Sequence, residues 1–146
     1  MIRVATAADI EALSRLRFAL WPDQPLEQRR AETRTNVART DGRLETLMAV
    51  DGAEVIGFAE VSLRSDYVNG CETSPVAFLE GIYVRAEHRR RGVGRALVAA
   101  AERWGRKRGC SEFASDALLA NAASRRFHSA AGFEEAERVV YFRKLL

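Results

Sequence analysis

The segment from Arg89 to Gly94 combines three consecutive arginines with two glycines, a composition suited to binding phosphate groups. Glycines allow backbone N–H groups to point into one concavity and allow a ligand to approach the chain closely. Arginines add charge-assisted hydrogen bonds to phosphate oxygens. A helix is expected to begin at Gly92, and its free N–H groups and positive dipole end favour an anion at the same place. The segment therefore predicts recognition of a diphosphate.

Other anion-binding loops fit this segment less well. A P-loop requires GxxxxGK followed by Ser or Thr, which is absent. A dinucleotide-binding fold requires GxGxxG directly after a strand, whereas here Leu97 replaces the third glycine and Arg85–Arg91 separate the expected strand from Gly92. Asp116 does follow at about the distance of a ribose-binding acid, but no N-terminal βαβ unit precedes the loop. Taken alone, the loop could also be a capped helix beside a solvated arginine run.

Carboxylates elsewhere in the chain indicate a second site, for a cationic partner. Glu80 lies inside the apolar stretch VAFLEGIYV, where a glutamate is costly unless it is used or paired. A carboxylate can accept the proton that an ammonium must lose before its nitrogen attacks a carbonyl group. Glu80 lies two residues before Ile82 and so on the same face of a strand. A salt bridge with an arginine is the alternative role for Glu80.

Hydrophobic periodicity and turn signals predict the elements that position these residues. Thr6 and Asp9 form a helix cap, Pro22 ends the first helix, and Asp51-Gly52 predicts a hairpin. The expected helices cover 10–20, 26–40, 92–108 and 121–131. The expected strands cover 2–4, 44–50, 55–63, 76–84, 112–115, 133–134 and 139–145. This order predicts an α+β (mixed α/β) fold with a central, mostly antiparallel sheet and helices on both faces, in one domain over residues 1–146.

Composition excludes several classes of function. The net charge of +3 is small for a dedicated nucleic-acid binder, and no apolar run approaches the length of a membrane span. The N-terminus does not resemble a signal peptide. Cys71 and Cys110 show neither a CxxC motif nor zinc spacing, so we expect two reduced thiols. The expectations are a cytoplasmic location, no membrane, no nucleic acid and no metal.

Two motifs resemble the GNAT family of N-acetyltransferases, and the resemblance covers nearly the whole chain. Arg89, Gly92 and Gly94 match the family signature of Gln or Arg, two residues, Gly, one residue, then Gly or Ala. Asn121 and the later segment Phe127–Phe133 match a second family pattern, in which a helix ends in aromatic residues before Gly-Phe. The resemblance implies acetyl-CoA as the co-substrate and a GNAT-like mixed sheet.

The family pattern also implies roles for individual residues. The backbone of Ile82, Tyr83 and Val84 is expected to pair with the pantetheine arm, and Asn121 is expected to contact the cofactor near its sulfur. The diphosphate is expected on the loop Arg89, Arg90, Arg91, Gly92, Val93 and Gly94. Many family members have a tyrosine acid where this chain has His128. His128 could donate the proton to the leaving thiolate, or it could be an ordinary core or surface histidine.

A more detailed resemblance, to aminoglycoside 6'-N-acetyltransferases, rests on the string SDYVNGCETSPVAFLEGIYV and on ALWP, ASD and GFEEAERVVYFRK. It implies transfer of acetyl to the 6'-amine of an aminoglycoside by direct attack in a ternary complex, giving antibiotic resistance. It also implies an acceptor pocket lined by Trp21, Tyr67, Glu80, Asp116 and Glu137, with Glu80 and Asp116 as candidate catalytic carboxylates. Acids complement a polycation and aromatic rings can stack on sugars or ammonium groups. Enzymes of this kind are often homodimers with C-terminal strands at the interface, and an edge strand in a monomer would look the same.

Three alternatives remain at this point. The enzyme could acetylate another amine, such as a polyamine or a protein N-terminus. The chain could be a non-catalytic acyl-CoA sensor, which would release no thiol with any amine. A nucleic-acid binder is disfavoured because no aromatic platform accompanies the arginine run.

We expect Gly92→Val to abolish cofactor binding, because a branched side chain at this position would crowd the diphosphate. Isothermal titration calorimetry with CoA measures the effect directly. Wild-type affinity in this variant would contradict the role assigned to the loop.

Overall fold

A five-stranded sheet runs through the centre of the computed structural model, which describes all residues 1–146. Its strands are β1 (Ile2–Val4), β2 (Leu44–Asp51), β3 (Glu54–Arg64), β4 (Val76–Val84) and β5 (Phe113–Ser115), in the spatial order β1-β2-β3-β4-β5. The first three pairings are antiparallel, and the pairing of β4 with β5 is parallel. The predicted mixed, mostly antiparallel sheet is confirmed.

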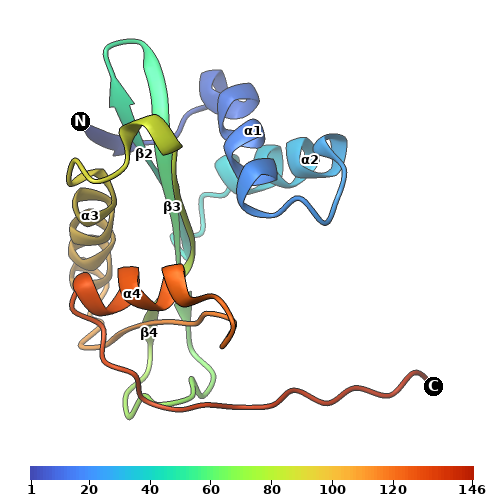
Figure 1. The fold of residues 1–146 in the computed structure, drawn as a ribbon, viewed down its shortest axis with the longest axis vertical. Helices are drawn as coiled ribbons and strands as arrows, with labels where there is room; N and C mark the ends of the chain where they lie inside the picture. Colours follow the sequence, from blue (N-terminus) through green and yellow to red (C-terminus); the bar gives the residue numbers. More distant parts are fainter.

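Helices cover both faces of this sheet, as the sequence predicts (Figure 1). The helices α1 (Ile10–Leu20) and α2 (Leu26–Val37) lie on one face, and α3 (Val93–Lys107) and α4 (Ala122–Ala130) on the other. Successive side chains of β2 point to opposite faces of the sheet and so contribute to two hydrophobic cores. Leu47 and Ala49 belong to the core beneath α3, whereas Met48 and Val50 belong to the core beneath α1. Two single-turn 3-10 helices, η1 (Ala7–Asp9) and η2 (Ala86–His88), connect elements. None of the helices combines the length and the apolar character needed to cross a membrane.

The predicted cap lies at the start of η1, which leads directly into α1, the helix that reaches the candidate site. Thr6 and Asp9 form a capping box, and Asp9 also accepts two hydrogen bonds of 2.8 Å from the guanidinium of Arg3. The Arg3 guanidinium holds the pKa of Asp9 well below its usual range. Asp9 is therefore a buried anion that joins β1 to the start of α1.

The strands β4 and β5 stay together over only three residues. Leu79 pairs with Ser115, and β5 ends there, so the residues of β4 from Glu80 to Val84 have no strand on that side. On the other side, a register shift leaves Glu80 without a partner, because Glu60 pairs with Gly81 and Val61 pairs with Leu79. The sheet therefore carries a bulge at Glu80, next to an unpaired strand edge.

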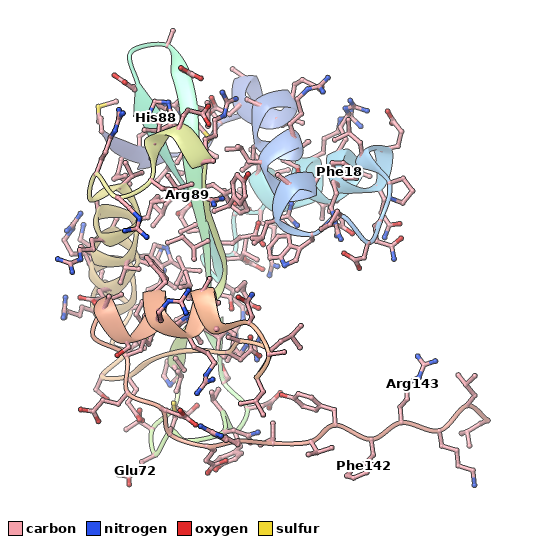
Figure 2. All side chains as sticks on the ribbon, in the orientation of Figure 1. Phe18, Glu72, His88, Arg89, Phe142 and Arg143 are labelled. Carbon is pink, nitrogen blue, oxygen red and sulfur yellow. The ribbon has the colours of Figure 1, made fainter.

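The expected strands at 133–134 and 139–145 are absent from the structure. The chain after α4 is extended and leaves the body of the molecule (Figures 1 and 2), and Phe142 is 92% exposed. The sequence pattern of this segment is that of a strand, but a strand also needs a neighbour for its N–H and C=O groups. No strand of the same chain supplies one here.

Candidate functional site

The loop before α3 has the backbone geometry of an anion-binding turn. Arg90 and Gly92 both have positive φ angles, of 61° and 81°. Gly92 is the N-cap residue that precedes α3, and no side chain caps this end of the helix. Arg90 and Arg91 are exposed and form no ion pair, so their charges are available to a ligand. Alternating backbone conformation and a free helix N-terminus place several N–H groups around one point.

Arg89 joins this loop to the unpaired end of β4 (Figure 2). Its Nε donates a hydrogen bond of 2.7 Å to the carbonyl oxygen of Val84, and its guanidinium lies 5.3 Å from the ring of Tyr83. The loop and the free edge of β4 therefore form one continuous surface.

The helix α4 packs against the start of α3. A side chain at Gly94 would come within 2.8 Å of the Phe127 ring, so only glycine permits this approach. Asn121, expected near the cofactor sulfur, is exposed, and its side chain caps α4 by accepting a hydrogen bond of 3.0 Å from the Ser124 N–H.

His128 lies where β4 and β5 separate. Its Nδ1 is 2.7 Å from the carbonyl oxygen of Ser124, so Nδ1 carries a hydrogen. Its Nε2 is 2.8 Å from Oγ of Ser115, which in turn is 3.2 Å from the carbonyl oxygen of Leu79. When His128 is protonated, every member of this chain has a partner: Nε2 donates to Ser115 and Ser115 donates to Leu79. The chain of groups therefore links His128 to Leu79 of β4, beside the bulge.

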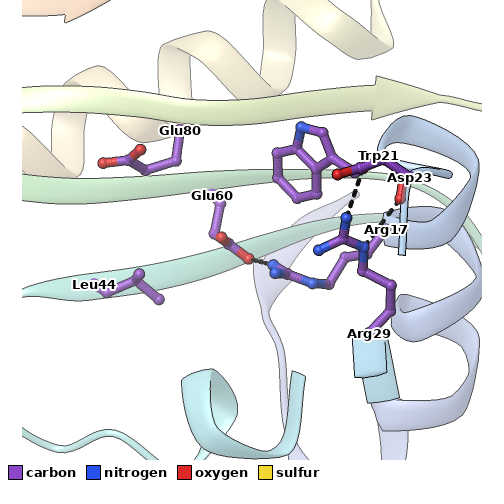
Figure 3. Close-up of a pocket in the computed structure, with 7 residues that line it drawn as sticks. All are labelled: Arg17, Trp21, Asp23, Arg29, Leu44, Glu60 and Glu80. Carbon is purple, nitrogen blue, oxygen red and sulfur yellow. Dashed lines mark hydrogen bonds and ion pairs between the residues drawn. The ribbon is translucent and has the colours of Figure 1, made fainter. Parts of the chain in front are cut away.

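A pocket of about 380 Å³ opens on the α1 and α2 side of the sheet (Figure 3). It contains Trp21 and Glu80, two of the five acceptor residues named from the sequence. The other lining residues are Arg17, Asp23, Arg29, Leu44 and Glu60. The pocket therefore lies on the face of the sheet opposite α3, and its lining includes the bulged residue Glu80.

Glu80 makes the salt bridge that the sequence left as an alternative. Arg64 donates to both of its carboxylate oxygens, at 3.1 and 2.9 Å, and Ser62 donates at 2.5 Å. The Arg64 guanidinium also lies 3.4 Å from the centre of the Phe78 ring. These contacts hold the Glu80 carboxylate in one orientation at the rim of the pocket.

Trp21 forms one wall of the pocket and is held on several sides. Its ring meets Phe58 edge-on, at 6.1 Å between centroids, and the guanidiniums of Arg17 and Arg29 lie 5.0 and 5.8 Å from its centre. Arg29 also donates a hydrogen bond of 3.0 Å to the Trp21 carbonyl oxygen. Gly81 lies beneath the ring, because a Cβ atom there would come within 2.3 Å of it. The missing side chain at Gly81 thus lets the indole cross β4.

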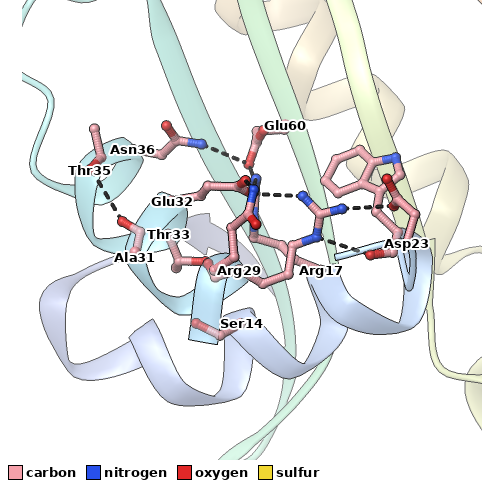
Figure 4. A network of polar contacts seen from close by, with 12 residues as sticks. Ser14, Arg17, Asp23, Arg29, Ala31, Glu32, Thr33, Thr35, Asn36 and Glu60 are labelled. Atoms are coloured by element: carbon pink, nitrogen blue, oxygen red, sulfur yellow. Dashed lines mark hydrogen bonds and ion pairs between the residues drawn. The ribbon is translucent and has the colours of Figure 1, made fainter. Parts of the chain in front are cut away.

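Glu60 and Arg17 line the pocket and are buried, although neither was predicted as a site residue from the sequence. Their side chains form an ion pair that continues into α2 (Figures 3 and 4). Glu60 carries the same sequence signal as Glu80, because it too is a glutamate inside an apolar strand. Burial lowers the pKa of Arg17, and the nearby carboxylate of Glu32 opposes that shift.

The structure leaves Tyr67, Asp116 and Glu137 outside this pocket. Tyr67 lies on the loop between β3 and β4 and is 75% exposed, and Asp116 is exposed directly after β5. Glu137 lies on the extended C-terminal segment, which nothing in the single chain holds against the pocket. In the single chain, the five expected acceptor residues therefore do not share one pocket.

Comparison with known proteins adds to this geometry. Residues 8–133 match the model of the acetyltransferase (GNAT) family. An aminoglycoside N(6')-acetyltransferase type 1 of Stenotrophomonas maltophilia is 51% identical over 97% of this chain and 91% of its own length. One of Serratia marcescens is 48% identical over 100% of this chain and 99% of its own length.

Solved structures agree with these sequence relatives. Aminoglycoside acetyltransferase AAC(6')-Iy, in complex with the bisubstrate analog CoA-S-monomethyl-acetylneamine, superposes with a TM-score of 0.93 at 43% identity, covering 100% of this chain and 98% of the other. The apo 6'-N-acetyltransferase AAC(6')-IG of Acinetobacter haemolyticus gives 0.94 at 41% identity, covering 100% and 99%.

The contact between Trp21 and Gly81 gives a direct test of the pocket wall. We expect Gly81→Ala to displace the indole and to lower the free energy of unfolding by about 1–3 kcal/mol, as overpacking does. Urea denaturation measures the stability, and fluorescence in a Trp104→Phe background reports on Trp21 alone. Gly105→Ala is the matched control, because its added Cβ would lie 2.7 Å from the Ala77 side chain in the core beneath α3, so it should lower stability without changing the Trp21 emission. An unchanged Trp21 emission in Gly81→Ala would contradict the proposed packing.

Proposed function

The chain belongs to the acetyltransferase (GNAT) family, and we propose that it transfers the acetyl group of acetyl-CoA to the 6'-amine of aminoglycoside antibiotics, which confers resistance. Relatives that carry this activity in their names match the chain over nearly its full length, and one of them was solved with a CoA-linked bisubstrate analog. The observation that carries the proposal is the bulge at Glu80, with an anion-binding loop on one side of the sheet and a carboxylate-containing pocket on the other. We take residues 1–146 as the single catalytic domain.

The donor side of the site is assigned to the unpaired end of β4 and the loop that follows. The backbone of Ile82, Tyr83 and Val84 is free of β5 and can pair with the pantetheine arm as an added strand. The loop Arg89–Gly94 supplies backbone N–H groups and guanidiniums to the diphosphate. Asn121, at the start of α4, faces the sulfur end of the cofactor in this assignment. No metal takes part in the proposed reaction.

The acceptor side is assigned to the pocket, where Glu80 and Trp21 already lie together. An aminoglycoside carries several ammonium groups, which carboxylates attract and an indole face can stack upon. Tyr67, Asp116 and Glu137 complete this site around its mouth when the substrate and the C-terminal segment are in place.

The proposed reaction proceeds in a ternary complex. The substrate ammonium loses one proton to Glu80 or Asp116, directly or through water, and its nitrogen then forms a bond to the thioester carbonyl carbon. The C–S bond breaks, the nitrogen loses a second proton, and sulfur leaves as the thiolate of CoA. The thiolate takes one proton and the other goes to solvent. Ser115 can donate to the sulfur and be re-protonated by His128, because the two side chains are hydrogen-bonded.

A homodimer is part of the proposal. The C-terminal segment exposes apolar side chains on an extended backbone: Val139, Val140, Tyr141, Phe142, Leu145 and Leu146. Exposed apolar residues on an unpaired strand-like segment indicate a partner surface. A second copy would supply the missing strand neighbour and would hold Glu137 near an acceptor site. A cytoplasmic location is also proposed, because both cysteines are free thiols.

The acceptor is tested by a thiol-release assay with aminoglycosides that bear or lack a 6'-amine. We expect acetyl-CoA-dependent release of CoA only with the 6'-amine, because that nitrogen is the nucleophile. The same assay with spermidine as the acceptor distinguishes an aminoglycoside acetyltransferase from a polyamine acetyltransferase, since the acidic pocket could bind either substrate. Release of thiol by compounds without a 6'-amine would refute the substrate assignment, and no release with any amine would indicate an acyl-CoA sensor.

The proton relay is tested by His128→Phe and Ser115→Ala. We expect kcat to fall at least about ten-fold in either variant, because a general acid typically contributes about 100-fold or more. The KM for acetyl-CoA should stay unchanged. Phenylalanine preserves the packing of ring 128 against Phe127 and Phe133. His88→Gln, which changes the other histidine, is the control and should keep the wild-type kcat. A wild-type kcat in both relay variants would remove the assignment.

The dimer is tested by placing a charge on the exposed tail. We expect Phe142→Asp to give a monomer by light scattering, because burying an unpaired carboxylate in an apolar interface is strongly unfavourable. Phe18→Asp changes a partly exposed phenylalanine on α1, away from the tail, and should remain dimeric (Figure 2). A wild-type protein that is monomeric at micromolar concentration contradicts this part of the proposal.

A further inference from the structure

Glu60 is a buried carboxylate of which only one oxygen is used by the protein. The residue lies on β3 opposite Gly81, and its side chain is 6% exposed. Its Oε2 accepts hydrogen bonds from Arg17 and, at 3.5 Å, from Asn36 (Figure 4). Its Oε1 accepts none and is not among the buried polar atoms sealed from solvent. Since Glu60 lines the pocket, this oxygen is the one available to a ligand there.

The charges around Glu60 do not balance among themselves. Arg17 pairs with Glu60 and Glu32, and Arg29 pairs with Glu32 and Asp23. These pairs join three carboxylates to two guanidiniums, which leaves one negative charge in surplus across the cluster. Glu80 adds no further negative charge to this surplus, because Arg64 neutralises its carboxylate.

The network is also poorly arranged for stability alone. Nε of Arg17 is buried without a hydrogen-bond partner, and half of the Glu60 carboxylate is unused. Buried ion pairs with incomplete hydrogen bonding often stabilise a fold less than an apolar pair of the same size. A cation that donates to Oε1 would satisfy the carboxylate and neutralise the surplus charge.

We propose that Glu60 binds a second ammonium group of the acceptor and so selects substrates that carry several amines. This inference rests on the proposed function, since the acceptor is the polyamine antibiotic. Glu60 and Glu80 lie on neighbouring strands and reach the same pocket from one face of the sheet (Figure 3). Gly81, opposite Glu60, adds no side chain between them. One acceptor molecule can therefore contact both carboxylates, with the reacting amine near Glu80 and another ammonium on Glu60.

The test compares two acceptors with two variants. One acceptor is neamine, and the other is a matched derivative in which the 6'-amine is the only amine. In Glu60→Gln the side-chain oxygen still accepts from Arg17, but an amide NH₂ group faces the pocket. We expect the KM for neamine to rise about ten-fold, the size of one lost hydrogen bond to a charged group, and the KM for the derivative to change less than about two-fold. The KM for acetyl-CoA should stay unchanged.

Glu27→Gln is the matched control. It removes a carboxylate from α2 that pairs with Arg30, outside the Arg17 and Arg29 network, and it does not line the pocket, so both acceptors should keep their wild-type KM values. Glu60→Asp is the second variant, which keeps the charge beside Arg17 and so the fold, yet withdraws the free oxygen from the pocket. It should raise the KM for neamine selectively, with a melting temperature near that of wild type.

Equal increases in KM for both acceptors, or the same increase in Glu27→Gln, would overturn the proposal and assign Glu60 a purely structural role. An unchanged KM for neamine in both Glu60 variants would overturn it as well. Failure of the proposed function has a different signature, because the wild-type enzyme would then release no thiol with either acceptor.

Discussion

The parallel pairing of β4 with β5 ends at Leu79 and Ser115, and the candidate site depends on that early separation. A continued ladder would have consumed the N–H and C=O groups of β4 up to Val84, and a cofactor could not have added a strand there. The separation also brings His128 to the end of β5, through its contact with Ser115. The bulge at Glu80 is on the same stretch of β4, where it turns a carboxylate toward the opposite face of the sheet. In the proposed reaction, donor and acceptor thus approach one short length of backbone from two sides.

The acceptor side is built from buried charge. Arg17, Arg29 and Glu60 are all less than 10% exposed, and α1, α2 and β3 each contribute to the cluster. Removing one member of such a cluster leaves its partner buried and uncompensated, which is strongly destabilising. The same charges hold Trp21 between two guanidiniums, so the position of the pocket wall depends on the ion pairs around it. Stability and recognition are therefore coupled in this half of the site.

Local sequence signals predicted most of the fold. The strand Val76–Val84 was predicted with its observed bounds, and the helix expected from Gly92 begins one residue later, at Val93. The GxG pattern and its neighbours predicted an anion loop, and in the structure Arg90 and Gly92 of this loop have positive φ angles. Each of these features depends on short-range periodicity or on a turn that particular residues require.

The features that could not be predicted depend on contacts between residues far apart in the sequence, and local sequence patterns do not indicate such contacts. The segment after Phe133 has strand-like composition, but strand formation needs a neighbour, and the single chain provides none. Arg17 lies among leucines in a helical pattern, where an arginine is ordinarily expected at the surface. Its burial follows from the ion pair with Glu60, which is distant in the sequence. Tyr67, Asp116 and Glu137 lie on loops and on the tail, so their positions relative to the pocket follow from tertiary contacts rather than from spacing.

The exposed tail has a consequence for solubility. Val140, Tyr141 and Phe142 form a short, uncharged, β-prone run that is more than three-quarters exposed, which is the kind of segment that can template cross-strand aggregation. Arg143 and Lys144 follow it directly, and Figure 2 shows Arg143 projecting from the tail beside Phe142. Stacking many copies in register would bring these cations together, so like-charge repulsion opposes open-ended assembly. The two basic residues therefore disfavour extended stacks of tails more than they disfavour burial of the apolar run between two copies.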